Sequence, residues 1–420
     1  MWRPRGRDRA GRTCAGGLDG SPGPLLRGAM PVDNTPPLLR YGRDLRPLWL
    51  LDPAATFLNH GSYGACPRAV LAAQRRWRDR LEAQPVRFMH DVLPGALRDQ
   101  ATALAGFLGA EPADLVLVEN ATSGVNAVLR SLRFAPGDEV LTTSHVYPAV
   151  RNAIRQICGS AGASLIEAPL PFPLHSPQQA VDAIAAALGP RTRLVVIDAV
   201  TSPTAVLLPV AEIAARCRGA GVRLLVDAAH APGMIPLDVA ALGADWVTGN
   251  AHKWLFAPKG CAFLWARKEA QEGLHPVVIS HGLGHGFAAE FDWVGTRDPS
   301  AWLAVGAALD FWRALGGAGL MARNRALADD AARMLAEAWS TEIGAPAAMR
   351  GAMAAIRLPL PGKAERETAL AINRRLWAEH RVEVPVMAFA GRLWARISAQ
   401  AYNDLDDYRR LADAVRAMRN

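Results

Sequence analysis

The chain has 420 residues, half of them hydrophobic and a fifth charged, which is enough to bury the cores of two or three domains. No run approaches the roughly 18–20 consecutive apolar residues of a membrane helix, which argues against a membrane-spanning protein. The net charge of +8 does not indicate nucleic-acid binding, because residues 1–29 hold six arginines against two aspartates and the rest mixes both signs.

The N-terminal segment and the cysteines indicate the cellular compartment in which the protein is expected. Residues 1–29 are rich in Gly, Pro and Arg, so we expect residues 1–45 to be disordered or extended, with Met30 as the native start. They lack the apolar stretch of a secretory signal. The cysteines are scattered and odd in number, namely Cys14, Cys66, Cys158, Cys217 and Cys261. Such spacing fits neither a disulfide framework nor a CxxC metal site, so we expect a reduced, cytoplasmic protein without a bound metal.

Helical and strand patterns alternate from about residue 66. A helix is expected to begin at Pro67, because proline suits the first helical turn. Short apolar strands are expected at 115–118, 139–143, 193–199 and 223–227, with helical stretches between them. Short buried strands that alternate with helices predict an α/β fold with a mostly parallel sheet.

The pattern changes after Pro299. We expect helices at 300–316 and 319–339, then strands at 353–358, 382–388 and 392–398, and a final helix. This order predicts a smaller α+β domain over residues 301–420, after a large domain over residues 46–300 whose first part is a candidate to pack with the smaller one.

Lys253 is the first candidate for chemistry. Only four lysines occur among 47 basic residues, so the chain otherwise uses arginine for positive charge. An ε-amine can form an imine with an aldehyde, whereas a guanidinium that never deprotonates cannot. Considered alone, Lys253 has an equally plain interpretation as a surface residue.

Asp227 and His230 give Lys253 a context. Asp227 ends an apolar strand, at the sheet edge where open α/β proteins bind ligands. A carboxylate there can keep a pyridine nitrogen protonated, and His230 can reach the phenolic oxygen of the same ring. The alternative interpretation of Asp227 is a helix cap.

Two further segments fit a planar phosphorylated ligand. Thr122 and Ser123 lie between a strand and a helix, where exposed backbone N–H groups can bind phosphate, although an ordinary N-cap looks the same. His145 or Tyr147, just after the next strand, can stack on a ring, or either can fill the core.

Together these segments resemble the class V aminotransferase family, fold type I enzymes that use pyridoxal 5′-phosphate (PLP). The residues around 57–64, 249–254 and 295–298 are most similar to the isopenicillin N epimerase-like branch, and the resemblance runs from about residue 55 to 416. It implies a PLP-dependent enzyme with a large α/β domain and a smaller C-terminal domain. It also implies a homodimer with shared active sites and an amino-acid-like substrate.

The resemblance also assigns roles to individual residues. Lys253 would be the Schiff-base lysine, Asp227 the partner of the pyridine nitrogen, and His230 the partner of the phenolic oxygen. The remaining contacts it implies are phosphate contacts from Thr122, Ser123 and His252, a phosphate contact across the dimer from Thr296, ring stacking by His145 or Tyr147, a carboxylate clamp by Arg396, and a substrate pocket lined by Asn59 and His60. Arg396, on a late strand, also has a plain structural interpretation.

The reaction type depends on the pocket, so several outcomes stay open. Cysteine desulfurases and selenocysteine lyases of this superfamily use a cysteine from the C-terminal part of the chain, and none follows Cys261 here. The first expectation is epimerisation, the reaction of the isopenicillin N epimerase-like branch that the chain resembles, with a role in secondary metabolism. A C–S β-lyase acting on an S-substituted cysteine comes second, followed by an aminotransferase or decarboxylating deaminase. A catalytically inactive PLP-fold binding protein is the non-enzymatic alternative.

Overall fold

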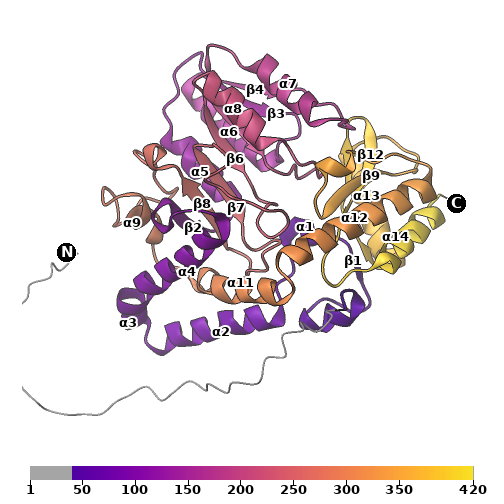
Figure 1. The fold of residues 1–420 in the computed structure, drawn as a ribbon, viewed down its shortest axis with the longest axis horizontal. Coiled ribbons are helices and arrows are strands. Elements are labelled where there is room, and N and C mark those ends of the chain that lie inside the picture. Colours follow the sequence, from indigo (N-terminus) through magenta and orange to yellow (C-terminus); the bar gives the residue numbers. More distant parts are fainter. Residues whose placement is uncertain (1–39, 420) are drawn as a thin grey trace, which may run out of the picture. The chain divides into compact units, whose positions relative to one another are not determined.

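The computed structural model describes residues 40–419 (Figure 1). The predictions for residues 1–29, for the start at Met30 and for most of the segment 1–45 therefore lie outside the described residues. None of the helices in residues 40–419 is long and apolar enough to span a membrane.

A seven-stranded sheet forms the centre of the large α/β part (Figure 1). Its order is β2 (Leu115–Val118), β8 (Ala262–Ala266), β7 (Trp246–Asn250), β6 (Arg223–Asp227), β5 (Thr192–Asp198), β3 (Glu139–Thr143) and β4 (Ser164–Ala168). All neighbouring strands pair in parallel except β8, which runs antiparallel to both β2 and β7. The prediction of an α/β fold with a mostly parallel sheet is confirmed.

Helices cover both faces of this sheet. Along β5, Leu194 and Val196 join one hydrophobic cluster, and Val195 and Ile197 join another, as the two-residue period of a strand requires. The first cluster includes α5 (Ala121–Ser131) and α6 (Pro148–Ala161), and the second includes α7 (Pro177–Ala187), α8 (Val210–Gly219) and α4 (Leu93–Leu108). Burial on both faces explains why these strands are nearly continuous apolar runs.

The remaining helices before residue 304 are α1 (His60–Tyr63), α2 (Arg68–Ala83), α3 (Pro85–Arg87), α9 (Phe287–Asp292) and α10 (Ser300–Leu303). Helix α2 begins one residue later than expected, with Pro67 as its N-cap. The helix expected at 300–316 breaks at Ala304 into α10 and α11 (Val305–Ala314). Both α10 and α11 pack against α2 and α4, and the domain boundary near residue 300 stays a prediction.

The C-terminal part is built on a three-stranded antiparallel sheet. It contains β11 (Val386–Phe389), β12 (Arg392–Ser398) and β9 (Met353–Arg357) in that order, with α12 (Ala318–Trp339), α13 (Arg366–His380) and α14 (Leu405–Ala417). The strand expected at 382–388 is two strands. Its first part, β10 (Val382–Glu383), pairs in parallel with β1 (Thr56–Phe57), and Pro385, which has no N–H to donate, separates it from β11.

Candidate active site

Three of the expected site residues, Asp227, Lys253 and Tyr147, lie at one edge of the central sheet, together with Asp198, which was not expected. Asp198 ends β5, Asp227 ends β6, and Lys253 follows β7, so all three lie at the carboxyl ends of parallel strands. Tyr147 follows β3 as the N-cap of α6. This is the edge at which open α/β sheets bind ligands.

Lys253 is a buried amine with an unusual charge state. Burial, and then the nearby Arg396 guanidinium, lower the pKa of its ammonium from 10.5 to about 7, a net value in which Asp227 and Asp198 act in the opposite direction. About half of the amine is therefore neutral at pH 7, and only the neutral amine has the lone pair that attacks an aldehyde.

His230 is held as one neutral tautomer beside this amine. The Trp254 indole N–H donates to His230 Nδ1 over 3.4 Å, so Nδ1 is an acceptor and the ring proton lies on Nε2. His230 Nε2 lies 3.2 Å from Lys253 Nζ. Burial, then Lys253 and Arg396, hold the pKa of His230 well below its usual range. The Nε2–H group is thus a fixed donor, which accepts no proton near neutral pH.

Asp198 and Asp227 form a pair of buried carboxyl groups. The sequence predicted Asp227 as a site residue but not Asp198. They are register partners on neighbouring parallel strands, so their side chains point to the same face of the sheet. Burial raises the pKa of both carboxyl groups, and for Asp198 the neighbouring Asp227 raises it well above its usual value. Asp227 accepts the Ala229 amide at 2.9 Å, whereas Asp198 Oδ2 has no hydrogen-bond partner within residues 40–419. Of the two carboxyl groups, Asp198 has the more strongly raised pKa, because of its burial and then the neighbouring Asp227.

Arg396 projects from β12 toward the same edge. Its Nη2 donates to Ser62 Oγ at 2.9 Å, and its Nη1 donates to the Ser202 carbonyl and, over 3.3 Å, to the Ser202 hydroxyl. Its buried Nε has no hydrogen-bond partner in the described part of the chain. Burial lowers the pKa of the guanidinium to about 10. A buried cation with a free donor fits an anionic ligand group.

The two residues expected to line the substrate pocket hold other elements in place. His60 is buried, with Nδ1 2.7 Å from the Tyr402 hydroxyl and Nε2 3.1 Å from the Lys253 carbonyl oxygen. Asn59 Nδ2 donates to Glu383 Oε1 at 3.0 Å, and its Oδ1 accepts from Ser62. His60 thus contacts the backbone of Lys253, and Asn59 contacts Ser62, which binds Arg396.

The structure separates the two candidates for ring stacking. His145 is fully buried: its Nδ1 lies 2.8 Å from the Thr204 hydroxyl, and its ring packs edge-on against Phe172 and Phe389. The Tyr147 side chain is 40% exposed. Burial, then Tyr63 and Asp227, raise the pKa of Tyr147, whereas Arg396 lowers it.

The start of α5 is the expected phosphate end of the site. The Asn120 side chain caps the Ser123 amide at 2.9 Å, and Asn250 Oδ1 accepts the Ala121 amide at 2.9 Å. Over residues 40–419, the Thr122 hydroxyl makes no side-chain hydrogen bond. A Cβ on Gly124 would lie 2.2 Å from the Thr248 hydroxyl, so glycine is what lets α5 approach β7 this closely.

His252 directly precedes Lys253 and follows β7, whose last residue, Asn250, binds the start of α5. Its Nδ1 is 2.9 Å from the Cys261 carbonyl, and burial lowers the pKa of its imidazole to about 4. A neutral ring bonded in this way through Nδ1–H leaves Nε2 as an acceptor. Cys66 is buried too, and burial raises the pKa of its thiol to about 12, so neither the thiolate nor a persulfide is readily formed there.

Thr296 is not brought to Lys253 within one chain. Its neighbours anchor the loop, because Arg297 pairs with Glu119 and lies 3.7 Å from the Trp302 ring centre, and Asp298 pairs with Arg78 at 2.7 Å. Thr296 itself is exposed. A cavity of about 190 Å³ next to this loop is lined by Leu117, Val118, Glu119, Ser123, Ala127, Pro276, Val277, Val278, Phe291, Val294 and Arg297.

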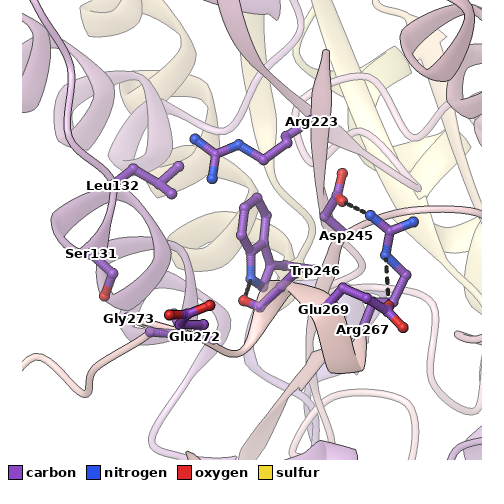
Figure 2. A pocket seen from close by; sticks show the side chains of 11 residues that line it. Ser131, Leu132, Arg223, Asp245, Trp246, Arg267, Glu269, Glu272 and Gly273 are labelled. Atoms are coloured by element: carbon purple, nitrogen blue, oxygen red, sulfur yellow. Dashed lines mark hydrogen bonds and ion pairs between the residues drawn. The ribbon is translucent and has the colours of Figure 1, made fainter. Parts of the chain in front are cut away.

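A second cavity, of about 170 Å³, lies at the opposite edge of the sheet. Figure 2 shows Arg223 and Trp246, which begin β6 and β7, with Arg267 paired to Asp245 and Glu269. The Trp246 indole N–H donates to the Ala270 carbonyl at 3.0 Å. Most of the charged residues that line this cavity pair with one another. The cavity lies at the amino ends of β6 and β7, away from the carboxyl strand ends that carry Asp227 and Asp198.

A family model described as aminotransferase class-V matches residues 57–411. The chain belongs to the class V aminotransferase family. It is 38% identical over 394 residues to a putative L-cysteine desulfhydrase of Oryza sativa subsp. japonica, covering 85% of this chain and 82% of that one. It is 34% identical over 387 residues to an isopenicillin N epimerase of Streptomyces clavuligerus, covering 88% and 96%.

Among solved structures, the fold of this class V chain matches that of the cystine C–S lyase C-DES bound to cysteine persulfide. The TM-score is 0.73 with 23% identity, covering 86% of this chain and 97% of that one. Another structure of that lyase, a mutant, carries glycine covalently linked to PLP. The predictions of the family, of a PLP-dependent enzyme and of the fold type I architecture are confirmed.

The residues of this class V enzyme fit PLP. A buried amine that is half neutral near pH 7 suits an aldehyde, and the buried Asp227 lies on the same sheet edge as a partner for a pyridine nitrogen. Thr122 and Ser123 stand at a helix start suited to phosphate. The Nε of Arg396, which has no hydrogen-bond partner within residues 40–419, can donate to an anionic ligand group.

Proposed function

We propose that this class V enzyme is a C–S β-lyase that acts on L-cysteine or an S-substituted L-cysteine by α,β-elimination. With L-cysteine, the Cα–H and Cβ–S bonds break, and the products after addition of one water are pyruvate, ammonia and hydrogen sulfide. The observation that carries the proposal is the inventory of acids and bases around Lys253.

That inventory contains one effective base within the described residues. Lys253 has a pKa of about 7, whereas His230 is a neutral ring with both nitrogens engaged. Tyr147 has a raised pKa, so its phenol stays protonated and can donate a proton but is a poor acceptor. An elimination needs one base at Cα and a donor for the departing sulfur. An epimerisation needs a second group that exchanges a proton at the opposite face of Cα.

Each residue has one task in this proposal. PLP, bound through Lys253, supplies the electron sink that makes the Cα proton acidic. Arg396 binds the substrate carboxylate and so fixes the orientation of Cα. Asp227 holds a negative charge beside the ring nitrogen, and His230 Nε2–H donates to the phenolic oxygen. The neutral Lys253 amine would take the Cα proton. Tyr147 would stack on the ring and donate a proton to the leaving sulfur.

The relatives support this order of candidates. Four proteins of Oryza sativa subsp. japonica and Arabidopsis thaliana that are 34–38% identical to the chain are described as L-cysteine desulfhydrases, three of them as putative or probable ones. Epimerisation, the first expectation from the sequence, is the second candidate. It is favoured by isopenicillin N epimerases that are 34% and 36% identical and are covered over 96% of their length. A role in secondary metabolism and a cytoplasmic location stay predictions, and one desulfhydrase relative is described as chloroplastic.

We also propose that the enzyme is a homodimer whose subunits share their active sites. Val278, Ile279 and Leu283 are large apolar residues within one six-residue stretch and are each more than half exposed, as is Tyr63. Thr296 lies in a loop that its neighbours anchor while its own side chain stays exposed. A second copy would cover these side chains and bring Thr296 to a phosphate.

Product analysis tests the reaction. The PLP-loaded enzyme is incubated with L-cysteine, L-cystine and S-methyl-L-cysteine, whose sulfur products are sulfide, cysteine persulfide and methanethiol. These products, pyruvate, ammonia and the chirality of the remaining amino acid are measured. We expect pyruvate and ammonia in equal amounts with the sulfur product, and none from the Lys253→Ala variant. Formation of D-amino acids without pyruvate would support epimerisation instead.

A further inference from the structure

Two buried or half-buried charges near the site have no direct ion partner. In residues 40–419 no carboxylate lies within ion-pair distance of Arg396, whose side chain is almost fully buried. Glu383, half-buried on β10, pairs with no cation in the same part of the chain; its side chain has a single hydrogen-bond partner, Asn59. A buried charge without compensation is costly, so the two are expected to compensate each other by another route.

Hydrogen bonds through two neutral side chains join these charges. Arg396 Nη2 donates to Ser62 Oγ at 2.9 Å. Ser62 donates its hydroxyl proton to Asn59 Oδ1 at 2.5 Å. Asn59 Nδ2 then donates to Glu383 Oε1 at 3.0 Å. Every donor points away from the guanidinium and toward the carboxylate. The opposite orientation of the Asn59 amide would set its oxygen against the carboxylate, so the two ends of the chain of bonds also fix this amide.

We propose that Glu383 is a positioning residue that orients and partly neutralises Arg396 through Asn59 and Ser62, and thereby sets the enzyme's affinity for the substrate carboxylate. The inference rests on the proposed function in one respect, the binding of a substrate carboxylate by Arg396. It extends the site to β10, which no residue of the candidate site occupies.

The indirect connection has a physical advantage over an ion pair. A carboxylate in contact with Arg396 would occupy the donors that the substrate needs, and its attraction would oppose binding. With Ser62 and Asn59 between them, Glu383 takes only the Nη2 edge, and the Nε–H group stays free. Aligned hydrogen bonds polarise one another in a low-dielectric interior, so part of the charge compensation is transmitted along the chain.

The backbone holds both ends of this chain. The Leu58 amide donates to the Glu383 carbonyl at 2.9 Å, and β1 pairs with β10 in register, Phe57 opposite Glu383. The Arg396 amide donates to the Pro385 carbonyl at 2.9 Å. The side chain of Glu383 takes part in neither contact, so replacing it removes the hydrogen-bond chain and leaves this backbone pairing intact.

A pair of small ligands isolates carboxylate recognition in the PLP-loaded enzyme. Glycine and methylamine both react with the cofactor through an amine, but only glycine has a carboxylate, and neither can eliminate a β-substituent. Their dissociation constants are measured from the absorbance change of the cofactor. We expect Glu383→Ala to weaken glycine binding about tenfold, the effect of one charge-assisted hydrogen bond, because the lost orientation of Arg396 outweighs the stronger attraction of its less compensated charge. Methylamine binding should be unchanged. Glu383→Gln keeps an acceptor for Asn59 and is expected to lose about threefold.

Three comparisons make the test specific. Glu379→Ala, which removes an exposed acid paired with Arg375 at the end of α13, is the matched control and should behave as wild type. Asn59→Leu should reproduce Glu383→Ala, and the double variant should be no weaker than either single variant, because both break the same chain. An unchanged ratio of glycine to methylamine affinity in both the Ala and the Gln variant of Glu383 would overturn the proposal.

The Arg396→Ala variant separates this proposal from the proposed function. If Arg396→Ala abolishes the preference for glycine while the Glu383 variants keep it, the hydrogen-bond chain is refuted and the carboxylate role of Arg396 stands. If Arg396→Ala keeps the preference, Arg396 does not bind the substrate carboxylate, and the proposed function loses that residue as well.

Discussion

The pKa of Lys253 leads to a quantitative prediction for capture of the cofactor by the apo-protein. With a pKa of about 7, the neutral fraction of the amine is about 9% at pH 6, 50% at pH 7 and 91% at pH 8. The rate of imine formation should therefore rise about tenfold from pH 6 to pH 8 and then level off. A lysine with the ordinary value of 10.5 would gain about a hundredfold over the same interval and continue to rise beyond pH 10.

Stopped-flow absorbance of apo-protein mixed with PLP measures this rate. The rate constant of N-α-acetyl-lysine methylamide, calculated per neutral amine at each pH, is the reference, and dividing by it removes the titration of PLP but keeps that of Lys253. The Arg396→Met variant provides a directional check, because Arg396 lowers the pKa of Lys253 and its removal should move the midpoint to higher pH. A capture rate that rises without a plateau up to pH 10 would refute the assignment of a neutral, buried amine.

Three further variants test other parts of the site. Arg396→Ala should lower kcat/KM by on the order of a hundredfold, the loss of one or two charged hydrogen bonds, and Arg396→Lys should lower it less; a lower Tm with unchanged kcat/KM would make Arg396 structural. Asp198→Asn should keep kcat/KM within about threefold, because an amide resembles a protonated acid, whereas Asp227→Asn should lose about a hundredfold or more. Equal losses would mean that Asp198 is ionised. Mixed dimers of Lys253→Ala and Thr296→Ala subunits should regain activity through one intact site, and an active monomer in sedimentation would rule out shared sites.

The strand ends could be predicted because the pattern that marks them is local. Asp227 closes an apolar run that is buried on both faces, and the structure ends β6 there. Asp198 has the same signal, since it follows four apolar residues. Extending that strand to Ala199 made Asp198 an interior residue, so its place beside Asp227 was missed.

The roles that sequence reasoning did not resolve depend on distant partners. His145 and Tyr147 follow the same strand two residues apart, and what distinguishes them is a contact between His145 and Thr204, 59 positions along the chain. Asn59 bonds to Glu383 and His60 to Tyr402, more than 300 residues away. Neither spacing nor residue type encodes such contacts.

Of two breaks in the expected helices and strands, one could be predicted from the sequence and the other could not. Pro385 is visible in the sequence and explains why the strand expected at 382–388 becomes two. The break at Ala304 has no such marker, because alanine favours helix. It follows from packing, as α10 and α11 both contact α2 and α4.

The central claim, that Lys253 carries the cofactor, is tested most directly by borohydride reduction of the PLP-loaded enzyme followed by peptide mapping. Reduction converts the imine to a stable pyridoxyl-lysine, and only four lysines can carry it. We predict one pyridoxyl group per chain on the peptide that contains Lys253, and none in the Lys253→Ala variant. A pyridoxyl group on Lys259, which donates to the Gly64 carbonyl at 3.0 Å, or on Lys268 or Lys363, would contradict the account.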